Sequence, residues 1–202
     1  NGKVGIGSTA PSANLEITST AVVGAETLLK LNVTDASKDY LKIANSTNTD
    51  GQFMPCIEGY HITDNRAALY LTGSIDGLSD NGANPIMVFD SRISSSAVVN
   101  RPLFSWDSFG ARKMILTSNG SLGIGTTTTG THKLAVEGSI GAREVKVQAA
   151  GWADFVFKKE YDLPTLEEIE MHIKEKGHLE NIPNEEEVLK DGINLGEMNA
   201  KL

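Results

Sequence analysis

The sequence is poor in the residue types on which disulfides, metal sites and catalytic centres most often depend. Its only cysteine is Cys56, which excludes an intrachain disulfide and a cysteine-based metal site, and we expect a small buried thiol there. No two of its four histidines lie at the separations of two to four residues that place metal ligands together. The glycine run at residues 5–7 lacks the third glycine and the strand–helix unit of a dinucleotide site. We therefore expect no metal, no cofactor and no catalytic residue.

Aromatic residues, long apolar runs and clusters of positive charge are also scarce. Only 6% of the residues are aromatic, and no apolar run approaches the roughly 20 residues of a membrane span. Without a basic stripe, we expect no binding to nucleic acid and no membrane insertion. The net charge of −8 is unevenly distributed, because residues 1–150 hold 12 Lys/Arg and 13 Asp/Glu whereas residues 151–202 hold 6 and 13. The change marks a boundary near Gly151.

What the sequence has in quantity is glycine, together with Thr, Ser and Asn over its first 150 residues. A glycine-rich motif occurs twice, as NGKVGIGST at residues 1–9 and as NGSLGIGTT at residues 119–127, and a short alternating segment follows each copy. The Asn-Gly pair favours a tight turn, and the two apolar residues of each copy point to one side of an extended segment. The glycines leave the other side open to the close approach of another backbone. Such a segment buries little within its own chain, so we expect its partners to come from other chains.

Between the two motifs, short segments rich in β-forming residues alternate with Asp-Gly, Asn-Gly and Asn-Pro dipeptides. Segments of this kind predict strands joined by tight turns. We therefore expect an antiparallel β domain between the repeats, with strands at residues 27–33, 40–44, 67–73, 85–90, 103–106 and 113–117.

After the acidic boundary the apolar spacing changes from two to between three and four residues, which predicts helices. Thr165 with Glu168 forms a capping box, and Gly177 is a typical helix end. Asn184 with Glu187 repeats the capping pattern for a second, short helix. Apolar residues then follow in the a and d rhythm with which a coiled coil begins: Leu195, Met198 and Leu202.

The two glycine motifs and the C-terminal segment resemble one known family. NGKVGIGSTAPSANLEI and NGSLGIGTTTTGTHKLAVEGSI resemble the repeats of tail-fibre-like proteins of Bacteroidota and of their phages and prophages. The segment DFVFKKEYDLPTLEEIEMHIKEKGHLENIPNEEEVLKDGINLGEMNAKL is similar to the C-terminal region of the same proteins, where it leads into a coiled coil. The resemblance is close over residues 1–17 and about 100–202. It implies a homotrimeric, β-rich stalk that carries receptor-binding or surface-binding parts.

We therefore expect a mainly β chain: an elongated, intertwined homotrimeric β fibre with an inserted antiparallel β domain and a small helical C-terminal region. The expected parts are a glycine-rich β repeat (shaft) at 1–27, an antiparallel β knob at 28–118, a second glycine-rich β repeat at 119–150 and an acidic helical region at 151–202. The residues expected in the trimer core are Val4, Ile6, Leu122, Ile124, Leu195, Met198 and Leu202.

The expected function is that of a structural and adhesive fibre segment, extracellular or virion-associated, that attaches to a cell surface. The expected partners are two copies of the same chain, a cell-surface receptor or glycan, and other fibre or tail components. One alternative to a phage or prophage tail fibre is a secreted bacterial surface filament or adhesin. Another is a fibre-borne polysaccharide depolymerase, which needs two carboxylates roughly 5 to 10 Å apart. Nothing in the sequence brings such a pair together, so we expect that the chain is not an enzyme.

Tyr60, His61 and Arg66 surround a predicted turn and are the residues that we expect to contact a ligand. Loops that a stiff scaffold presents are where recognition usually occurs. The expected ligand is a cell-surface receptor or glycan.

Three other groups have a functional interpretation that ranks below a structural one. Phe104 and Trp106 offer a stacking platform for a sugar, but alternation puts both on one face of a strand, as in a core. The Asp/Asn/Gly loop at residues 76–82 offers calcium ligands but lacks the spacing and the closing glutamate of an EF-hand. His172 and His178 flank a helix end, where a cationic side chain is favourable without any metal.

Overall fold

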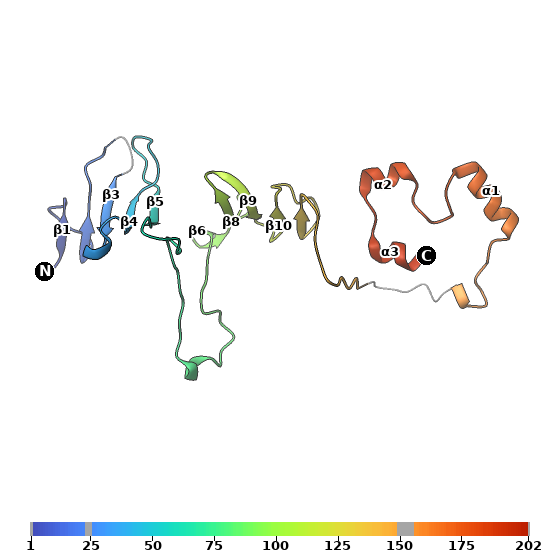
Figure 1. The fold of residues 1–202 in the computed structure, drawn as a ribbon, viewed down its shortest axis with the longest axis horizontal. Coiled ribbons are helices and arrows are strands. Elements are labelled where there is room, and N and C mark those ends of the chain that lie inside the picture. Colours follow the sequence, from blue (N-terminus) through green and yellow to red (C-terminus); the bar gives the residue numbers. More distant parts are fainter. Residues whose placement is uncertain (1, 23–25, 149–155, 202) are drawn as a thin grey trace. The chain divides into compact units, whose positions relative to one another are not determined.

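The computed structural model describes residues 2–22, 26–148 and 156–201. The chain divides into two units, Asn1–Asp90 and Ser91–Leu202, and each is described by itself. Both contain short strands in small sheets, and the few helices lie in the second (Figure 1). The expectation of a mainly β chain with few helices is therefore confirmed. The homotrimer and the fibre stay predictions.

The first unit contains two sheets. A parallel pair of strands comes first, and a three-stranded antiparallel sheet of order β3-β4-β5 follows it. Two short 3-10 turns interrupt the loops. The elements of this unit are β1 (Val4–Ile6), β2 (Leu15–Ile17), β3 (Thr27–Leu31), η1 (Thr34–Ala36), β4 (Tyr40–Asn45), β5 (Pro55–Tyr60) and η2 (Gly77–Ser79).

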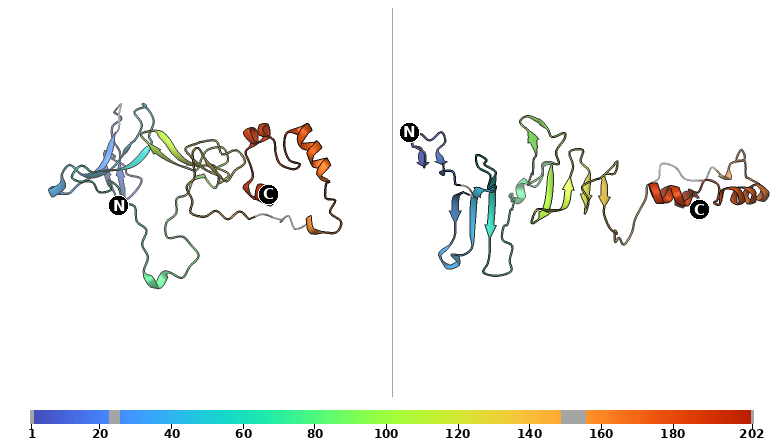
Figure 2. Two further views of the ribbon diagram at one scale, coloured as in Figure 1. Left: turned by 45° about the vertical axis from the view of Figure 1, so that its right-hand side comes forward. Right: turned by 90° about the horizontal axis from the view of Figure 1, so that it is seen from above.

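The second unit contains a small hairpin, a four-stranded sheet of order β11-β10-β9-β8 and three helices. Two views turned away from that of Figure 1 show the same sheets (Figure 2). The elements are β6 (Arg92–Ile93), β7 (Ser96–Ala97), β8 (Phe104–Ser108), β9 (Ala111–Leu116), β10 (Leu122–Ile124), β11 (Leu134–Val136), α1 (Leu166–Lys176), α2 (Glu185–Asp191) and α3 (Leu195–Lys201).

The two glycine motifs build the same local structure, a strand that pairs in parallel with the segment just after it. In the first copy, the Val4 N–H donates to the Asn14 carbonyl at 2.8 Å. In the second, the Leu122 N–H donates to the Lys133 carbonyl at 2.9 Å. The internal repeat is thus structural as well as sequential, and its paired residues are Val4 with Leu15, Ile6 with Ile17, Leu122 with Leu134 and Ile124 with Val136.

The central glycine of each motif is required because the chain's own loop passes directly over it. A Cβ atom on Gly5 would lie 2.2 Å from the Ser8 carbonyl oxygen, and one on Gly123 would lie 2.4 Å from that of Thr126. Both separations are far inside van der Waals contact. The approaching backbone therefore belongs to the same chain, whereas the sequence suggested a partner chain.

Several strand predictions need correction. The predicted strands at 67–73 and 85–90 are not formed, because neither segment pairs with a strand in the part of the chain that the structure describes. β5 was not predicted, because its sequence PCIEGY does not alternate. The strands of the predicted antiparallel domain at 28–118 fall in both units, and β9 and β10 pair across its expected end.

The helical region follows the capping signals of the sequence. Both predicted capping boxes are present, at Thr165 and at Asn184, and Gly177 ends α1 in the left-handed conformation with φ of 77°. These predictions are confirmed because caps depend on residues within one helical turn. The expected boundary at Gly151 and the side chain of Leu202 lie outside the described residues.

The second glycine motif gives a first test. We expect Gly123→Ala to destabilise the four-stranded sheet by about 1–3 kcal/mol, because the new Cβ displaces backbone. Gly141→Ala is the matched control in the same unit, since a Cβ there meets no atom within 4 Å. Thermal unfolding followed by circular dichroism measures both, and equal midpoints for the two variants would contradict the steric explanation.

Candidate assembly faces and binding surface

The three-stranded sheet has one apolar face that its own unit leaves largely uncovered. Side chains of paired residues lie on the same face, and alternate residues of a strand share it. The register pairs Leu31 with Leu41, Leu29 with Ile43, and Ile43 with Ile57. All these side chains are exposed, Ile57 by 61%. We call this set the first apolar face: Leu29, Leu31, Leu41, Ile43 and Ile57.

The four-stranded sheet repeats this arrangement over two rows of paired residues. Trp106 is 50% exposed, Ile124 is 40% exposed, and the others range from half-buried to exposed. Phe104 and Trp106 do share one face, as predicted, but little of the chain covers the indole of Trp106. We call this set the second apolar face: Phe104, Leu116, Leu122 and Leu134 in one row, and Trp106, Met114, Ile124 and Val136 in the other.

The described residues among those expected in a trimer core range from half-buried to exposed in the single chain. Val4 and Ile6 are exposed on the β1–β2 pair, as is Ile124 on the second apolar face, where Leu122 is half-buried. In α3, Leu195 is exposed and Met198 half-buried. Sequence reasoning missed the first apolar face, although the Leu-Lys-Leu and Leu-Lys-Ile alternation of β3 and β4 signals it.

Few large side chains are buried within either unit. Among the described residues, the buried hydrophobic side chains are Ala44 and Ile115. Cys56, expected to be buried, is half-buried in β5. One buried alanine in the first unit and one buried isoleucine in the second do not make a hydrophobic core.

The opposite face of the three-stranded sheet is polar and aromatic. The rings of Tyr40 and Tyr60 stack with their centroids 5.1 Å apart. The ammonium group of Lys30 lies 4.3 Å from the centroid of the Tyr40 ring, a cation–π contact. An ion pair of 2.9 Å joins Lys42 to Glu58, which is directly opposite it in the ladder. We call these five residues the polar face.

His61 ties the loop after β5 to the start of β4. Its Nδ1 lies 3.0 Å from a carboxylate oxygen of Asp39, and its Nε2 lies 2.7 Å from one of Asp64. A neutral imidazole has one N–H, so only the imidazolium donates to both carboxylates. The carboxylate of Asp39 also accepts from the Ile62 N–H at 2.9 Å and from the Thr63 hydroxyl. This hydrogen-bonded cluster fixes the turn at the edge of the polar face.

Both carboxyl groups of this cluster favour the ionised form. The hydrogen bond from the Thr63 hydroxyl, with those from backbone N–H groups and the charge of His61, lowers the pKa of Asp39. The Arg66 side chain, followed by His61, holds the pKa of Asp64 far below its ordinary value. Arg66 Nε donates to Asp64 at 2.7 Å, and its guanidinium remains 79% exposed.

Of the three residues that were expected to contact a ligand, His61 and Arg66 share the carboxylate of Asp64, whereas Tyr60 stacks on Tyr40. Tyr60 is exposed on the polar face, and Arg66 extends into solvent from its ion pair. His61 is largely buried between two carboxylates and positions the turn. Tyr60 and Arg66 offer a ring face and a cation to a ligand. Tyr40, Lys30 and Lys42, beside them, were missed because β pairing brings them there.

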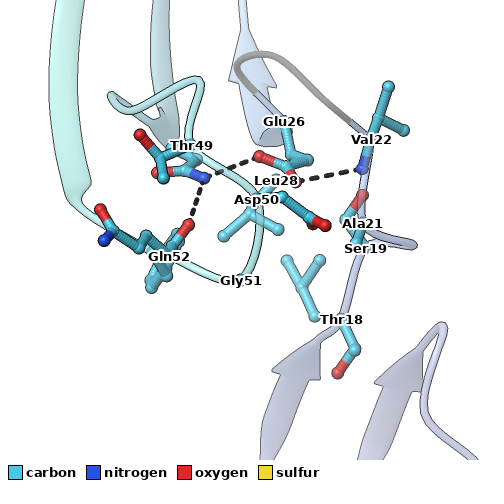
Figure 3. A pocket seen from close by; sticks show the side chains of 13 residues that line it. Thr18, Ser19, Ala21, Val22, Glu26, Leu28, Thr49, Asp50, Gly51 and Gln52 are labelled. Carbon is cyan, nitrogen blue, oxygen red and sulfur yellow. Dashed lines mark hydrogen bonds between the residues drawn. The ribbon is translucent and has the colours of Figure 1, made fainter.

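A cavity of about 330 Å³ lies between the end of β2 and the three-stranded sheet. Figure 3 shows Glu26 between Val22 and the loop that carries Thr49 to Gln52. At its polar wall, the Asn45 amide donates to Glu26 at 2.8 Å and to the Gln52 carbonyl at 2.9 Å, and it accepts from the Met54 N–H at 2.9 Å. With its hydrogen bonds made inside the chain, Asn45 holds the strands and loop together.

The remaining sequence candidates show local structural contacts. The Asp76 carboxylate accepts from the Leu78 N–H at 2.9 Å and so caps η2. The rings of His172 and His178 meet edge to face with centroids 5.5 Å apart. Within the described ranges, no group of three or more His, Cys, Asp or Glu side chains is placed to hold a metal ion. Nor does any helix in those ranges have the length and apolar character that a bilayer crossing requires.

The carboxylate cluster predicts a pH dependence. Because the folded pKa values of Asp39 and Asp64 are lowered, their contribution to stability is present above about pH 4, where an unfolded Asp is ionised, and is lost as the pH falls through the folded values. We expect Asp39→Asn to unfold a few degrees below the wild type at pH 6, and the difference to shrink towards pH 2. Asp35→Asn in η1 is the matched control. A difference that stays constant with pH would contradict the charge argument.

The chain was compared with protein-family models, with curated proteins and with solved structures, and it matches none of them.

Proposed function

We propose that this chain is a structural and adhesive segment of a homotrimeric extracellular fibre, of the phage or prophage tail-fibre type, that attaches to a cell surface. The observation that carries the proposal is the pair of uncovered apolar faces. A sheet with one apolar side needs a second layer against it. Since neither unit provides that layer for its own sheet, a copy of the same chain is the simplest source.

Self-association explains why the apolar residues occur in regular rows. In a closed ring of identical subunits, each copy offers the same surfaces to its neighbours. Three copies placed with their apolar faces towards a common axis would bury these rows together. Folding and assembly would then be a single equilibrium that depends on concentration.

The adhesive part of the proposal rests on the polar face and its turn. When the apolar side of a sheet faces a partner, its other side faces solvent. That side carries the tyrosine stack, with Lys30 and Lys42 over or beside the Tyr40 ring. The turn that follows β5 carries the exposed side chain of Arg66. Aromatic faces with adjacent charged donors suit the rings and hydroxyl groups of a glycan. We therefore propose a cell-surface glycan or receptor as its ligand.

The two alternative functions, a bacterial surface filament or adhesin and a depolymerase, require different features of the structure. A secreted bacterial surface filament or adhesin needs the same assembly and the same exposed face, so the genes next to this one distinguish it from a phage fibre. A depolymerase needs a general acid with a raised pKa. The carboxyls of Asp39 and Asp64, which share His61, have lowered pKa values and so do not supply that acid. We therefore keep the adhesive fibre segment as the proposal.

Assembly is tested by light scattering after size-exclusion chromatography. We expect the wild type to have the mass of three chains. Ile124→Asp on the second apolar face should abolish the trimer, because three charges would be buried without partners. Phe109→Asp is the matched control: Phe109 is fully exposed at the β8–β9 turn and has a φ of 48°, a conformation that Asp tolerates. A folded, monomeric wild type would overturn the proposal.

Adhesion is tested by binding of the trimer to a glycan array. We expect Tyr60→Ala to weaken binding about tenfold through the loss of its stacking face. Tyr60→Phe, which keeps the ring, should bind like the wild type. Light scattering on each variant checks that the trimer persists. If both Tyr60→Ala and Arg66→Ala bound glycans like the wild type, the polar face and its turn would not be the binding surface. The proposed assembly would not be affected by that result.

A further inference from the structure

Residues 62–90 form an arm in which every residue is exposed. Two legs, residues 67–75 and 81–89, lead to and from η2, which is drawn in green (Figure 1). The legs lie side by side, because a Cβ on Gly73 would be 3.1 Å from the Ile86 carbonyl oxygen. The arm lies wholly within the first unit.

The apolar parts of the legs, residues 67–75 and 86–89, have the composition of buried strands, whereas residues 81–85 are turn formers. Neither leg contains a charged residue, although 22% of the whole chain is charged, and Asp76 and Asp80 lie at the tip. Ile86, Met87, Val88 and Phe89 are consecutive, so in an extended strand their side chains would point alternately to both sides. All four are exposed. A continuous apolar run is typical of a strand that is covered on both faces.

The backbone of the legs lacks strand partners as well. Within the described chain, the N–H groups of residues 67–75 and 82–89 donate no hydrogen bond. The sequence nevertheless predicted strands at 67–73 and 85–90. Unpaired backbone on an apolar extended segment is a template for a strand from another chain.

The arm also continues an apolar surface already described. A Cβ on Gly59 would lie 2.1 Å from the Ala68 carbonyl oxygen, so the first leg passes over the end of β5. Gly59 pairs with Leu41 and shares its side of the sheet, which is the first apolar face. Uncovered apolar surface therefore extends from that face into the legs.

We propose that the two legs become β-strands by pairing with the arms of neighbouring copies of this chain. This inference rests on the proposed trimer and identifies the segments through which the copies would pair. A run that is apolar on both sides needs a cover on each side, and two neighbouring copies in a trimer provide two. Uncharged legs of identical chains meet without the repulsion that like charges opposite each other would cause. The charged tip stays outside this contact.

Hydrogen–deuterium exchange of the full-length trimer, followed by mass spectrometry, tests the proposal. We expect peptides from 67–75 and 81–89 to exchange at least tenfold more slowly than the corresponding free peptides. Peptides that span the η2 tip should exchange freely. A trimer whose legs exchange at the rate of free peptides would overturn the inference while the proposed function stands. A monomeric wild type would overturn both.

A pair of matched variants distinguishes strand exchange from protection of another origin. Val88 in the second leg is 66% exposed and Leu78 at the tip is 90% exposed. Val88→Asp should remove the slow exchange from both legs and lower the thermal midpoint of the trimer. Leu78→Asp, the same kind of change beside Asp76 and Asp80, should leave both unchanged. Equal behaviour of the two variants would show that the legs are not packed against other copies.

Discussion

Within each unit, every sheet of the described residues is a single layer, and that constraint governs the rest of the structure. A β-sheet with an apolar side is stable only when a second layer covers that side. The first apolar face, the second apolar face and the β1–β2 pair all lack such a layer within their own units. The hydrophobic effect, which supplies most of the free energy of folding, is thus largely unused in a solitary copy. In the proposed trimer, association with identical copies would supply that free energy.

The glycine motif decides which side of each repeat stays open. In both copies the loop that joins the paired strands crosses the glycine side, so that Ser8 lies against Gly5 and Thr126 against Gly123. That side is therefore occupied by the same chain, at a distance that no other residue tolerates. The opposite side keeps the apolar pairs and remains free. The motif thus forms, from about fifteen residues, a pair of parallel strands with only one side covered. It occurs near the start and near the end of the β region.

The parts of the structure that sequence reasoning found are those that depend on near neighbours. The capping boxes at Thr165 and Asn184, the repeat and four of the strands all follow from residues close along the chain. The parallel pairing inside the repeat was missed because the partner strand lies across a loop that carries no signal of its direction. The strands predicted at 67–73 and 85–90 failed for the opposite reason: their local pattern is that of strands, but a strand also needs a partner. Likewise, Asp39 meets His61 only because β4 and β5 pair, so the cluster that holds the predicted binding turn could not be seen in advance.

The two faces of the three-stranded sheet link assembly to recognition. Along β4, Leu41 and Ile43 alternate with Tyr40 and Lys42, so a shift of one residue would exchange the apolar side with the polar side. If Leu41 and Ile43 were buried against a partner, Tyr40 and Lys42 would therefore have to point to the opposite side of the sheet. Side chains that are already ordered lose less conformational entropy when a ligand binds. In the proposed trimer, the apolar contacts at the centre would thus also set the affinity at the surface, and a loosened sheet would bind less well even with Tyr60 and Arg66 intact.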